Sequence, residues 1–169
     1  MKKIAVFVED MYHELELWYP YYRLQEAGFQ PVLVGTGDKK EYLSKRDLPA
    51  KEEVSIRDAN AADYDGVVVP GGFAPDKMRR SKEMLSFVQE CFDDGKLVAA
   101  ICHGPWVLIS ARVLAGKKCT SCAAIIDDVV NAGGKFEDAE AVVDGNLVTS
   151  RSPKDLPAFM KAVLSVLQS

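Results

Sequence analysis

A cysteine followed by a histidine and a Gly-Pro pair stands directly after an apolar segment of the chain. Leu97–Ile101 is a continuous apolar run, typical of a strand covered on both faces of its sheet, and Cys102 follows it without a linker. Gly104 permits a tight turn, and Pro105 suits the first position of a helix, where no amide donor is needed. The sequence therefore predicts Cys102 at a turn between a strand and a helix, at the sheet edge where α/β proteins place their sites.

This position favours the thiolate form of Cys102. We expect the first amides of the following helix, and its positive dipole end, to face the sulfur and lower the pKa of the thiol. The competing interpretation is a small buried apolar residue, the usual role of a free cysteine. The turn and the adjacent His103 favour the nucleophile.

The glycines of Pro70-Gly71-Gly72 are predicted to reach the same edge of the sheet, because they end the preceding strand. Backbone amides of Gly71 and Gly72, together with that of His103, can hold a developing oxyanion on a substrate. The alternative is an ordinary glycine turn after a strand. The nearby Cys102 gives weight to the oxyanion interpretation.

The segment Glu14–Pro20 directly follows the first predicted strand, so a carboxyl group in it would lie at the same edge of the sheet. Glu16 can hydrogen-bond the Cys102 sulfur and exchange a proton with it. The alternative is a solvated acid in a first helical turn, where the helix dipole favours it. His13 precedes the segment and either lines the site or is exposed.

A second cysteine pattern, Cys119-Thr120-Ser121-Cys122, is a single CxxC sequence. It has no second pair and no suitably spaced histidine, so it indicates zinc only weakly. Three roles stay open: structural thiols, a redox partner for Cys102, and a metal pair. Because the zinc signal is weak, we expect no metal site. We also expect no bound cofactor, since Gly35-Thr36-Gly37 lacks the rest of a nucleotide-binding fingerprint.

Strand-like and helix-like segments alternate along the chain. This alternation predicts an open, mostly parallel sheet with helices on both faces, and Asp144-Gly145 predicts a C-terminal β-hairpin. Residues 36–64 are expected to hold one or two short strands, with Val54–Ile56 the clearest of them. The other predicted strands are Ile4–Val8, Pro31–Gly35, Val67–Val69, Leu97–Ile101, Ala141–Val143 and Leu147–Ser150. The predicted helices contain Leu17, Tyr21 and Leu24; Leu85, Val88 and Phe92 after a Ser81 cap; Pro105–Leu114; and Leu156 to Leu167 after a Ser152-Pro153 start.

Length and composition predict one ordinary globular domain over residues 1–169. The chain is 48% apolar and 27% charged, with interspersed charges and a net charge of -4, so we expect no nucleic-acid or membrane partner. The first apolar run is too short for a secretory signal, and no stretch approaches the length of a membrane span. The four cysteines are therefore expected to be reduced thiols in the cytoplasm.

Taken together, these motifs resemble the ThiJ/PfpI superfamily, whose members are related in fold to class I glutamine amidotransferases. The resemblance covers nearly the whole chain. It is carried by Glu14–Pro20, Val69–Gly72, Ala100–Pro105 and Thr149–Pro153, with Asp127-Asp128, Asp138–Glu140 and Val143–Gly145 typical of the PfpI branch. It implies a flavodoxin-like three-layer α/β/α sandwich with a mostly parallel central sheet.

The resemblance also implies residue roles. Cys102 would be the nucleophile, Glu16 its carboxyl partner, and Gly72 and His103 the oxyanion donors, with Arg151 near the site. His103 would orient with an acid from a neighbouring subunit of a homo-oligomer, a dimer or a hexamer. The matching acid here is Asp76, where relatives often carry the longer glutamate.

One position departs from the family pattern. Where relatives often carry a tyrosine after a Thr-Ser pair, this chain has Cys122. If that position borders the site, Cys122 adds a second thiol beside Cys102. We therefore hypothesise a reversible Cys102–Cys122 disulfide.

The function that the resemblance implies is a cysteine-dependent attack on a carbonyl. Members are variously glyoxalase III-type enzymes, deglycases and intracellular cysteine peptidases. We expect a small dicarbonyl or a glycated molecule as substrate. Peptide hydrolysis is the alternative within the family, and a non-enzymatic redox sensor or chaperone using the same cysteine is the alternative outside catalysis.

Overall fold

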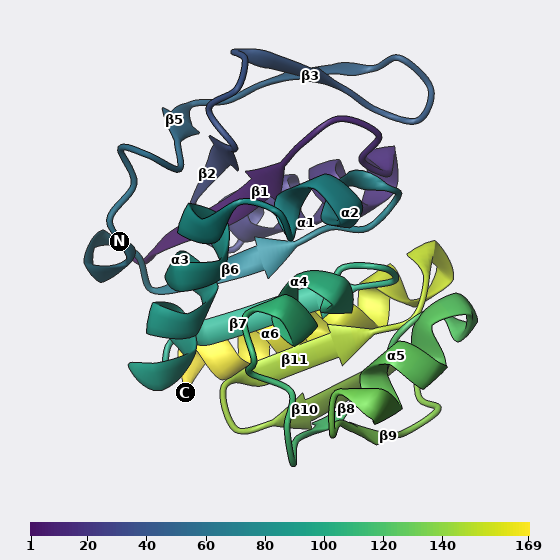
Figure 1. Cartoon of the computed structure of the whole chain (residues 1–169). Helices are drawn as coiled ribbons and strands as arrows, with labels where there is room; N and C mark the ends of the chain where they lie inside the picture. Colours follow the sequence, from purple (N-terminus) through teal and green to yellow (C-terminus); the bar gives the residue numbers. More distant parts are fainter.

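The computed structural model describes residues 1–169 and has a seven-stranded sheet at its centre (Figure 1). The strand order is β10-β11-β7-β6-β1-β2-β5, and every neighbouring pair is parallel except β10 and β11. These strands are β1 (Lys3–Val8), β2 (Gln30–Gly35), β5 (Val54–Ser55), β6 (Gly66–Val69), β7 (Leu97–Ile101), β10 (Ala141–Asp144) and β11 (Leu147–Ser150). The predicted mostly parallel sheet and C-terminal hairpin are confirmed.

Helices cover both faces of the sheet and complete the three layers (Figure 1). On one face, α1 (Glu14–Glu26) packs on β2 and against α6 (Leu156–Gln168), which lies under β7 and β11. On the other face, α3 (Lys82–Asp93) packs on β6 and β7 and against α4 (Pro105–Ser110). The short helices α2 (Ala74–Met78) and α5 (Ile126–Asn131) also pack against α4. β6 and β7 lie between the two helical layers and are buried along their whole length, which explains their continuous apolar sequences.

The remaining elements are short. Antiparallel β3 (Glu41–Leu43) and β4 (Pro49–Lys51) form a separate hairpin, and parallel β8 (Lys118–Cys119) and β9 (Lys135–Phe136) form a separate pair. Single 3-10 turns occupy Ala61–Asp63, Ala123–Ile125 and Pro153–Asp155. Residues 36–64 therefore hold three short strands, more than the one or two expected.

Three predicted helices differ in detail from the observed ones. The helix after Cys102 ends at Ser110 instead of continuing to Leu114, because Arg112 adopts a left-handed φ of 61° and the chain reverses. The last helix begins at Leu156 after a 3-10 turn, and the Ser152 side chain makes no capping bond.

The third difference concerns the buried face of α3. Ser81 caps this helix as predicted, accepting a hydrogen bond from the Met84 amide at 3.2 Å. The fully buried residues, however, are Met84, Phe87, Val88 and Cys91. Leu85 and Phe92 lie at the margin of this face, because the helix is rotated from the predicted orientation.

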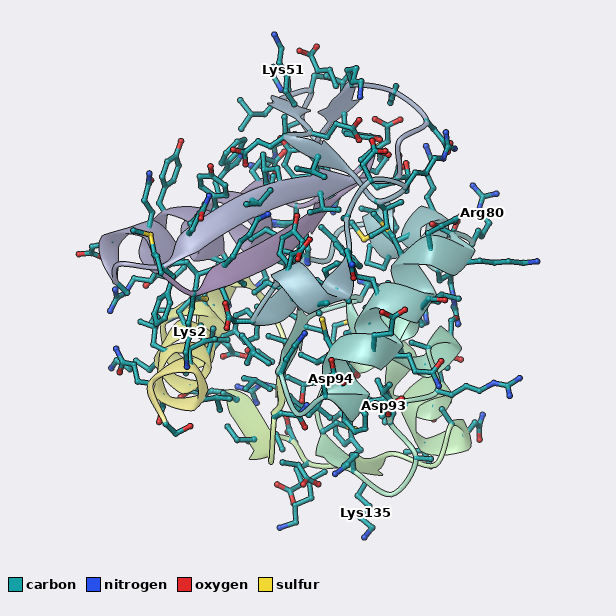
Figure 2. All side chains as sticks on the ribbon, turned by 90° about the vertical axis from the view of Figure 1, so that its left-hand side faces the viewer. Lys2, Lys51, Arg80, Asp93, Asp94 and Lys135 are labelled. Atoms are coloured by element: carbon teal, nitrogen blue, oxygen red, sulfur yellow. The ribbon has the colours of Figure 1, made fainter.

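Charged side chains project outward around the molecule, as the labelled Lys51, Arg80, Asp93 and Lys135 show (Figure 2). None of the helices combines the length and the apolar character needed to cross a membrane.

Candidate active site

Cys102 occupies the sharp turn predicted between β7 and α4. Its φ is 63°, a left-handed conformation that costs a non-glycine residue on the order of 1–3 kcal/mol. Hydrogen bonds on both sides hold this conformation: the Cys102 amide donates to the Ser150 carbonyl at 3.0 Å, and the Cys102 carbonyl accepts from the Cys122 amide at 3.1 Å. The turn leaves the side chain half-buried at the carboxyl end of β7.

The same turn brings the ring of His103 to the sulfur of the preceding residue. His103 Nδ1 lies 3.5 Å from Cys102 Sγ and 3.5 Å from Cys122 Sγ. The ring packs edge-on against Trp106, with centroids 5.1 Å apart, and lies 6.2 Å from the ring of Phe73. His103 is thereby held between two thiols.

Glu16 is fully buried at the start of α1, so the solvated alternative is wrong. Its Oε2 accepts a hydrogen bond from the Gly71 amide at 2.7 Å, while its Oε1 has no hydrogen-bond partner in the chain. Burial raises the pKa of Glu16 to about 7, although the Gly71 amide and the adjacent Cys102 thiol partly oppose this shift. The carboxyl is therefore able to gain or lose a proton near neutral pH.

The two glycines of the Pro-Gly-Gly sequence have different roles. Gly71 does not offer the free amide that we expected, because its N–H is used to hold Glu16. A Cβ at this position would lie 2.4 Å from Glu16 Oε2 and 2.9 Å from Cys102 Cβ, so only glycine fits. Gly72 has a φ of 74°, and its amide, like that of His103, donates to no oxygen of the chain. The Gly72 amide thus has no acceptor within the chain, whereas the His103 amide hydrogen-bonds to the Cys102 sulfur and opposes the rise of its pKa.

The two sulfurs beside His103 carry a negative charge as a pair. The pKa of Cys122 is lowered to about 5, because the Cys102 thiol and the His103 ring hydrogen-bond to its thiolate. The pKa of Cys102 is raised by its contact with Cys122, by burial and by the carboxylate of Glu16. The prediction that the pKa of Cys102 is lowered is therefore wrong, because it rested on the helix amides and dipole and did not include the effects of Cys122, burial and Glu16 on the thiol.

The CxxC sequence does not form a pair of facing thiols. Cys122 contacts the site, whereas Cys119 is fully buried in β8 and its pKa is raised to about 11, mainly by burial. A Cβ on Gly134 would lie 2.9 Å from the Cys119 sulfur, which shows how tightly that side chain is enclosed. Cys119 is structural, and the CxxC metal pair is not formed.

Two of the predicted residues lie apart from the thiols. Asp76 is exposed on α2 and makes no hydrogen bond to His103 within the chain. Arg151 is occupied by ion pairs with Asp138 at 2.9 Å and with Asp155 at 2.8 Å. Arg151 therefore fixes the segment after β11 and does not contact the sulfur.

His13 borders the site through its backbone. Its amide donates to the Gly71 carbonyl at 3.4 Å, and its half-buried ring has an Nδ1 atom with no partner. Burial lowers the pKa of His13, so the neutral ring is favoured. His13 supports the Gly71–Gly72 turn and makes no contact with the sulfurs.

Comparison with known proteins places this arrangement in a family. The DJ-1/PfpI family matches residues 2–166. The chain belongs to the DJ-1/PfpI family. It is 40% identical over 166 residues to Deglycase PH1704 of Pyrococcus horikoshii, covering 98% of this chain and 99% of that protein. It is also 40% identical over 167 residues, 99% of each chain, to a Bacillus subtilis protein whose name assigns it provisionally to the cysteine proteases.

A solved DJ-1/PfpI structure agrees closely with the fold described above. A two-domain protein of Anabaena variabilis, with a DJ-1/ThiJ/PfpI-like and a ferritin-like domain, superposes with a TM-score of 0.96 at 45% identity. The match covers 99% of this chain and 48% of that one, so this chain spans about half the length of the two-domain protein. The resemblance inferred from the sequence motifs is confirmed.

The DJ-1/PfpI motifs did not reveal how the segment of Cys122 is positioned. The Thr120 amide donates to the Thr149 hydroxyl at 2.8 Å, and the Cys122 amide donates to the Cys102 carbonyl. These bonds join residues about twenty to thirty positions apart in sequence and follow no local pattern. The contact between Cys122 and the Cys102 site was indicated only by the departure of Cys122 from the family pattern.

Proposed function

We propose that this DJ-1/PfpI protein is a cysteine-dependent enzyme that attacks reactive carbonyls, with deglycase activity and glyoxalase III-type activity on free dicarbonyls. The observation that carries the proposal is the placement of Cys102 beside a buried acid, Glu16, whose pKa is raised to about 7. Addition to a carbonyl requires a nucleophile, here the Cys102 sulfur, and a proton carrier that titrates near neutral pH, here Glu16. The deglycase name of the Pyrococcus relative supports the same chemistry.

The first step is addition of the Cys102 sulfur to an aldehyde carbon. With methylglyoxal, the S–C bond forms as the C=O double bond opens, and the oxygen takes the thiol proton to give a hemithioacetal. With a glycated amine, the sulfur displaces the amine from its carbinol carbon, and the amine leaves with the thiol proton. The amides of Gly72 and His103 stabilise the oxyanion that develops.

The second step moves a proton within the adduct. Glu16 as carboxylate removes the hydrogen from the sulfur-bearing carbon and returns a proton to the neighbouring carbonyl carbon. The hydroxyl proton of the sulfur-bearing carbon passes to the oxygen of that neighbour, so the C–OH becomes the C=O of a thioester and the former ketone or aldehyde becomes an alcohol. Water then cleaves the C–S bond to give lactate from methylglyoxal, or glycolate from glyoxal, and restores the thiol. His103 lies against both sulfurs and exchanges protons with them during this cycle.

An exposed acid on α2 is proposed to complete the site in a homo-oligomer. Asp76 makes no bond to His103 of its own chain, so it is free to reach His103 of a neighbouring copy. Mixing the inactive Cys102→Ala and Asp76→Asn variants tests this: hybrid oligomers should regain activity, because some sites then combine an intact cysteine with an intact acid. No recovery in mixtures shown to exchange subunits would refute the shared site.

One parallel assay tests the proposed function. The reduced protein is incubated with methylglyoxal, with methylglyoxal-treated N-acetyl-lysine and with a fluorogenic peptide, and lactate, free amine and fluorescence are measured. Cys102→Ala should reduce lactate and amine release at least about a thousandfold, whereas Cys91→Ala, a buried thiol far from the chemistry, should retain activity. Peptide cleavage without carbonyl turnover would favour the peptidase, and lack of all three activities would refute an enzyme.

A further inference from the structure

Three soft ligand atoms converge at the turn after β7. Cys102 Sγ, His103 Nδ1 and Cys122 Sγ all lie within 4.8 Å of one another. The imidazole nitrogen is 3.5 Å from each sulfur. No other group of three cysteine, histidine or acidic side chains in the chain approaches this closely.

The two nitrogen–sulfur separations match edges of a zinc coordination tetrahedron. With Zn–S bonds of about 2.3 Å and Zn–N bonds of about 2.0–2.1 Å, sulfur and nitrogen ligands lie about 3.5 Å apart. We propose that Cys102, His103 and Cys122 form a binding site for a zinc ion, with the fourth coordination position left to water. Two cysteines and one histidine with an open position are a ligand set known from zinc proteins.

The three side chains are held in place before any ion binds. Cys102 is fixed by the backbone bonds of its turn, and the Cys122 amide donates to the Cys102 carbonyl at 3.1 Å, which ties the two cysteine-bearing segments together. The His103 ring is packed against Trp106. Little conformational freedom remains to be lost on binding, and this favours affinity.

The buried acid beside the cluster is an independent observation that points to a cation. Glu16 is fully buried and its Oε1 atom has no donor in the chain. A buried carboxylate without a full set of partners is costly, and a divalent ion held by the adjacent Cys102 would offset its charge. The two cysteine sulfurs and this carboxyl group thus surround the cluster with groups that favour a bound cation.

Zinc held in this way would block the sulfur that attacks carbonyls. Binding removes the remaining thiol proton of the pair, and Cys102 then donates its lone pair to the metal. We therefore expect zinc to inhibit turnover reversibly, and this consequence rests on the proposed function. The binding site itself does not depend on any activity.

Cobalt serves as the spectroscopic probe for the site. Co²⁺ is added to the reduced, metal-free protein without oxygen, and absorption is recorded before and after competition with Zn²⁺. We expect thiolate-to-cobalt charge-transfer bands and tetrahedral d–d bands that saturate at one ion per chain and disappear when zinc is added. Zinc affinity is then obtained from the competition.

Two variants identify the ligands. Cys122→Ser should weaken zinc binding at least about a hundredfold, since losing a ligand costs more than losing an outer-shell partner. Cys119→Ala, from the same CxxC sequence, should bind as the unaltered chain does, and Cys91→Ala provides a second control. Weak octahedral bands, no saturable binding, or equal affinity in Cys122→Ser would overturn the proposal. Zinc binding by a protein that turns over no carbonyl would support the zinc site and refute only the proposed function.

Discussion

The four thiols of the chain fall into two pairs with opposite surroundings. Cys91 and Cys119 are fully buried, and burial raises their pKa values to about 12 and about 11. Cys102 and Cys122 are half-buried and face His103 and each other. Because a thiol reacts as its thiolate, neighbours and exposure decide which sulfurs do chemistry, and spacing in the sequence does not.

The surroundings of the reactive pair also combine backbone strain with a buried polar group. Cys102 has a left-handed backbone conformation, and Glu16 is buried without a full set of hydrogen bonds. Cys91 and Cys119, in contrast, are fully buried members of the hydrophobic core. Strain and buried polar groups concentrated at one turn are typical of functional sites. The following predictions test this contrast.

The largest effect is expected from removing the acid beside the reactive pair. Glu16→Gln keeps the size and the Gly71 hydrogen bond but cannot carry a proton, so carbonyl turnover should fall about a hundredfold to ten-thousandfold. The rise of the unaltered enzyme's rate with pH through about 7, where Glu16 ionises, should disappear. Glu14→Gln on the same helix is the control: Glu14 bonds to Ser44 and to the Arg46 amide, away from the sulfur.

The same substitution should change how stability depends on pH. The folded protein holds the Glu16 proton more tightly than the unfolded chain, where the pKa is near 4.5, so the free energy of unfolding falls as pH rises from about 4.5 to about 7. Glu16→Gln removes this loss and should be more stable than the original by about 3 kcal/mol above pH 7, with no gain near pH 4. Urea unfolding of both proteins near pH 4 and above pH 7 measures this difference in the free energy of unfolding. An equal difference at the two pH values would contradict a buried charge on Glu16.

A smaller effect is expected from moving the acid without removing it. Gly71→Ala places a methyl group 2.4 Å from Glu16 Oε2, so the carboxyl must shift. We expect turnover to fall about a hundredfold, because such misplacement is costly, and stability to fall by about 1–3 kcal/mol. Gly95→Ala is the control: its φ of 71° causes strain, but no atom lies within 4 Å, so stability should fall while turnover is unchanged.

The smallest structural change is expected from mild oxidation, which should alter the Cys102–Cys122 pair and leave Cys91 and Cys119 as free thiols. Peroxide converts one sulfur of the reactive pair to a sulfenic acid, and the other displaces water to form a Cys102–Cys122 disulfide. Peptide mass mapping should find this link, reversed by a dithiol reductant, in the original chain and in Cys119→Ala. Sulfinic acid at Cys102 without any disulfide would contradict it, as would a link to Cys119.

The fold could be predicted from the sequence because its strands are continuous apolar runs. Leu97–Ile101 and Val67–Val69 have this character because both faces of the sheet are covered. Short elements escaped prediction: α2 and the β8–β9 pair contain too few residues to show a period. The orientation of α3 was missed because apolar residues lie on two neighbouring faces of that helix, and tertiary packing selects between them.

The site was predicted in part. The turn at Cys102 has a local signal, in the glycine and proline that follow a buried strand. The neighbours of that sulfur have no local signal, because Glu16 and Cys122 lie 86 residues before and 20 residues after it in the sequence. The family resemblance indicated both contacts, but not their effect on the thiol. The pKa of Cys102 was consequently predicted in the wrong direction, and the Gly71 amide was assigned to the substrate when Glu16 uses it.

The rate of alkylation at each cysteine as a function of pH tests the central claim most directly. The reduced protein is given a limiting amount of iodoacetamide between pH 5 and 10, and the four cysteine peptides are quantified. We predict that labelling begins at the Cys102–Cys122 pair at or below neutral pH, that Cys122→Ser moves the labelling of Cys102 to lower pH because the contact that raises its pKa is lost, and that Cys91 and Cys119 stay unlabelled. A pair that is inert at pH 7, or that reacts no faster than the two buried thiols, would contradict the account.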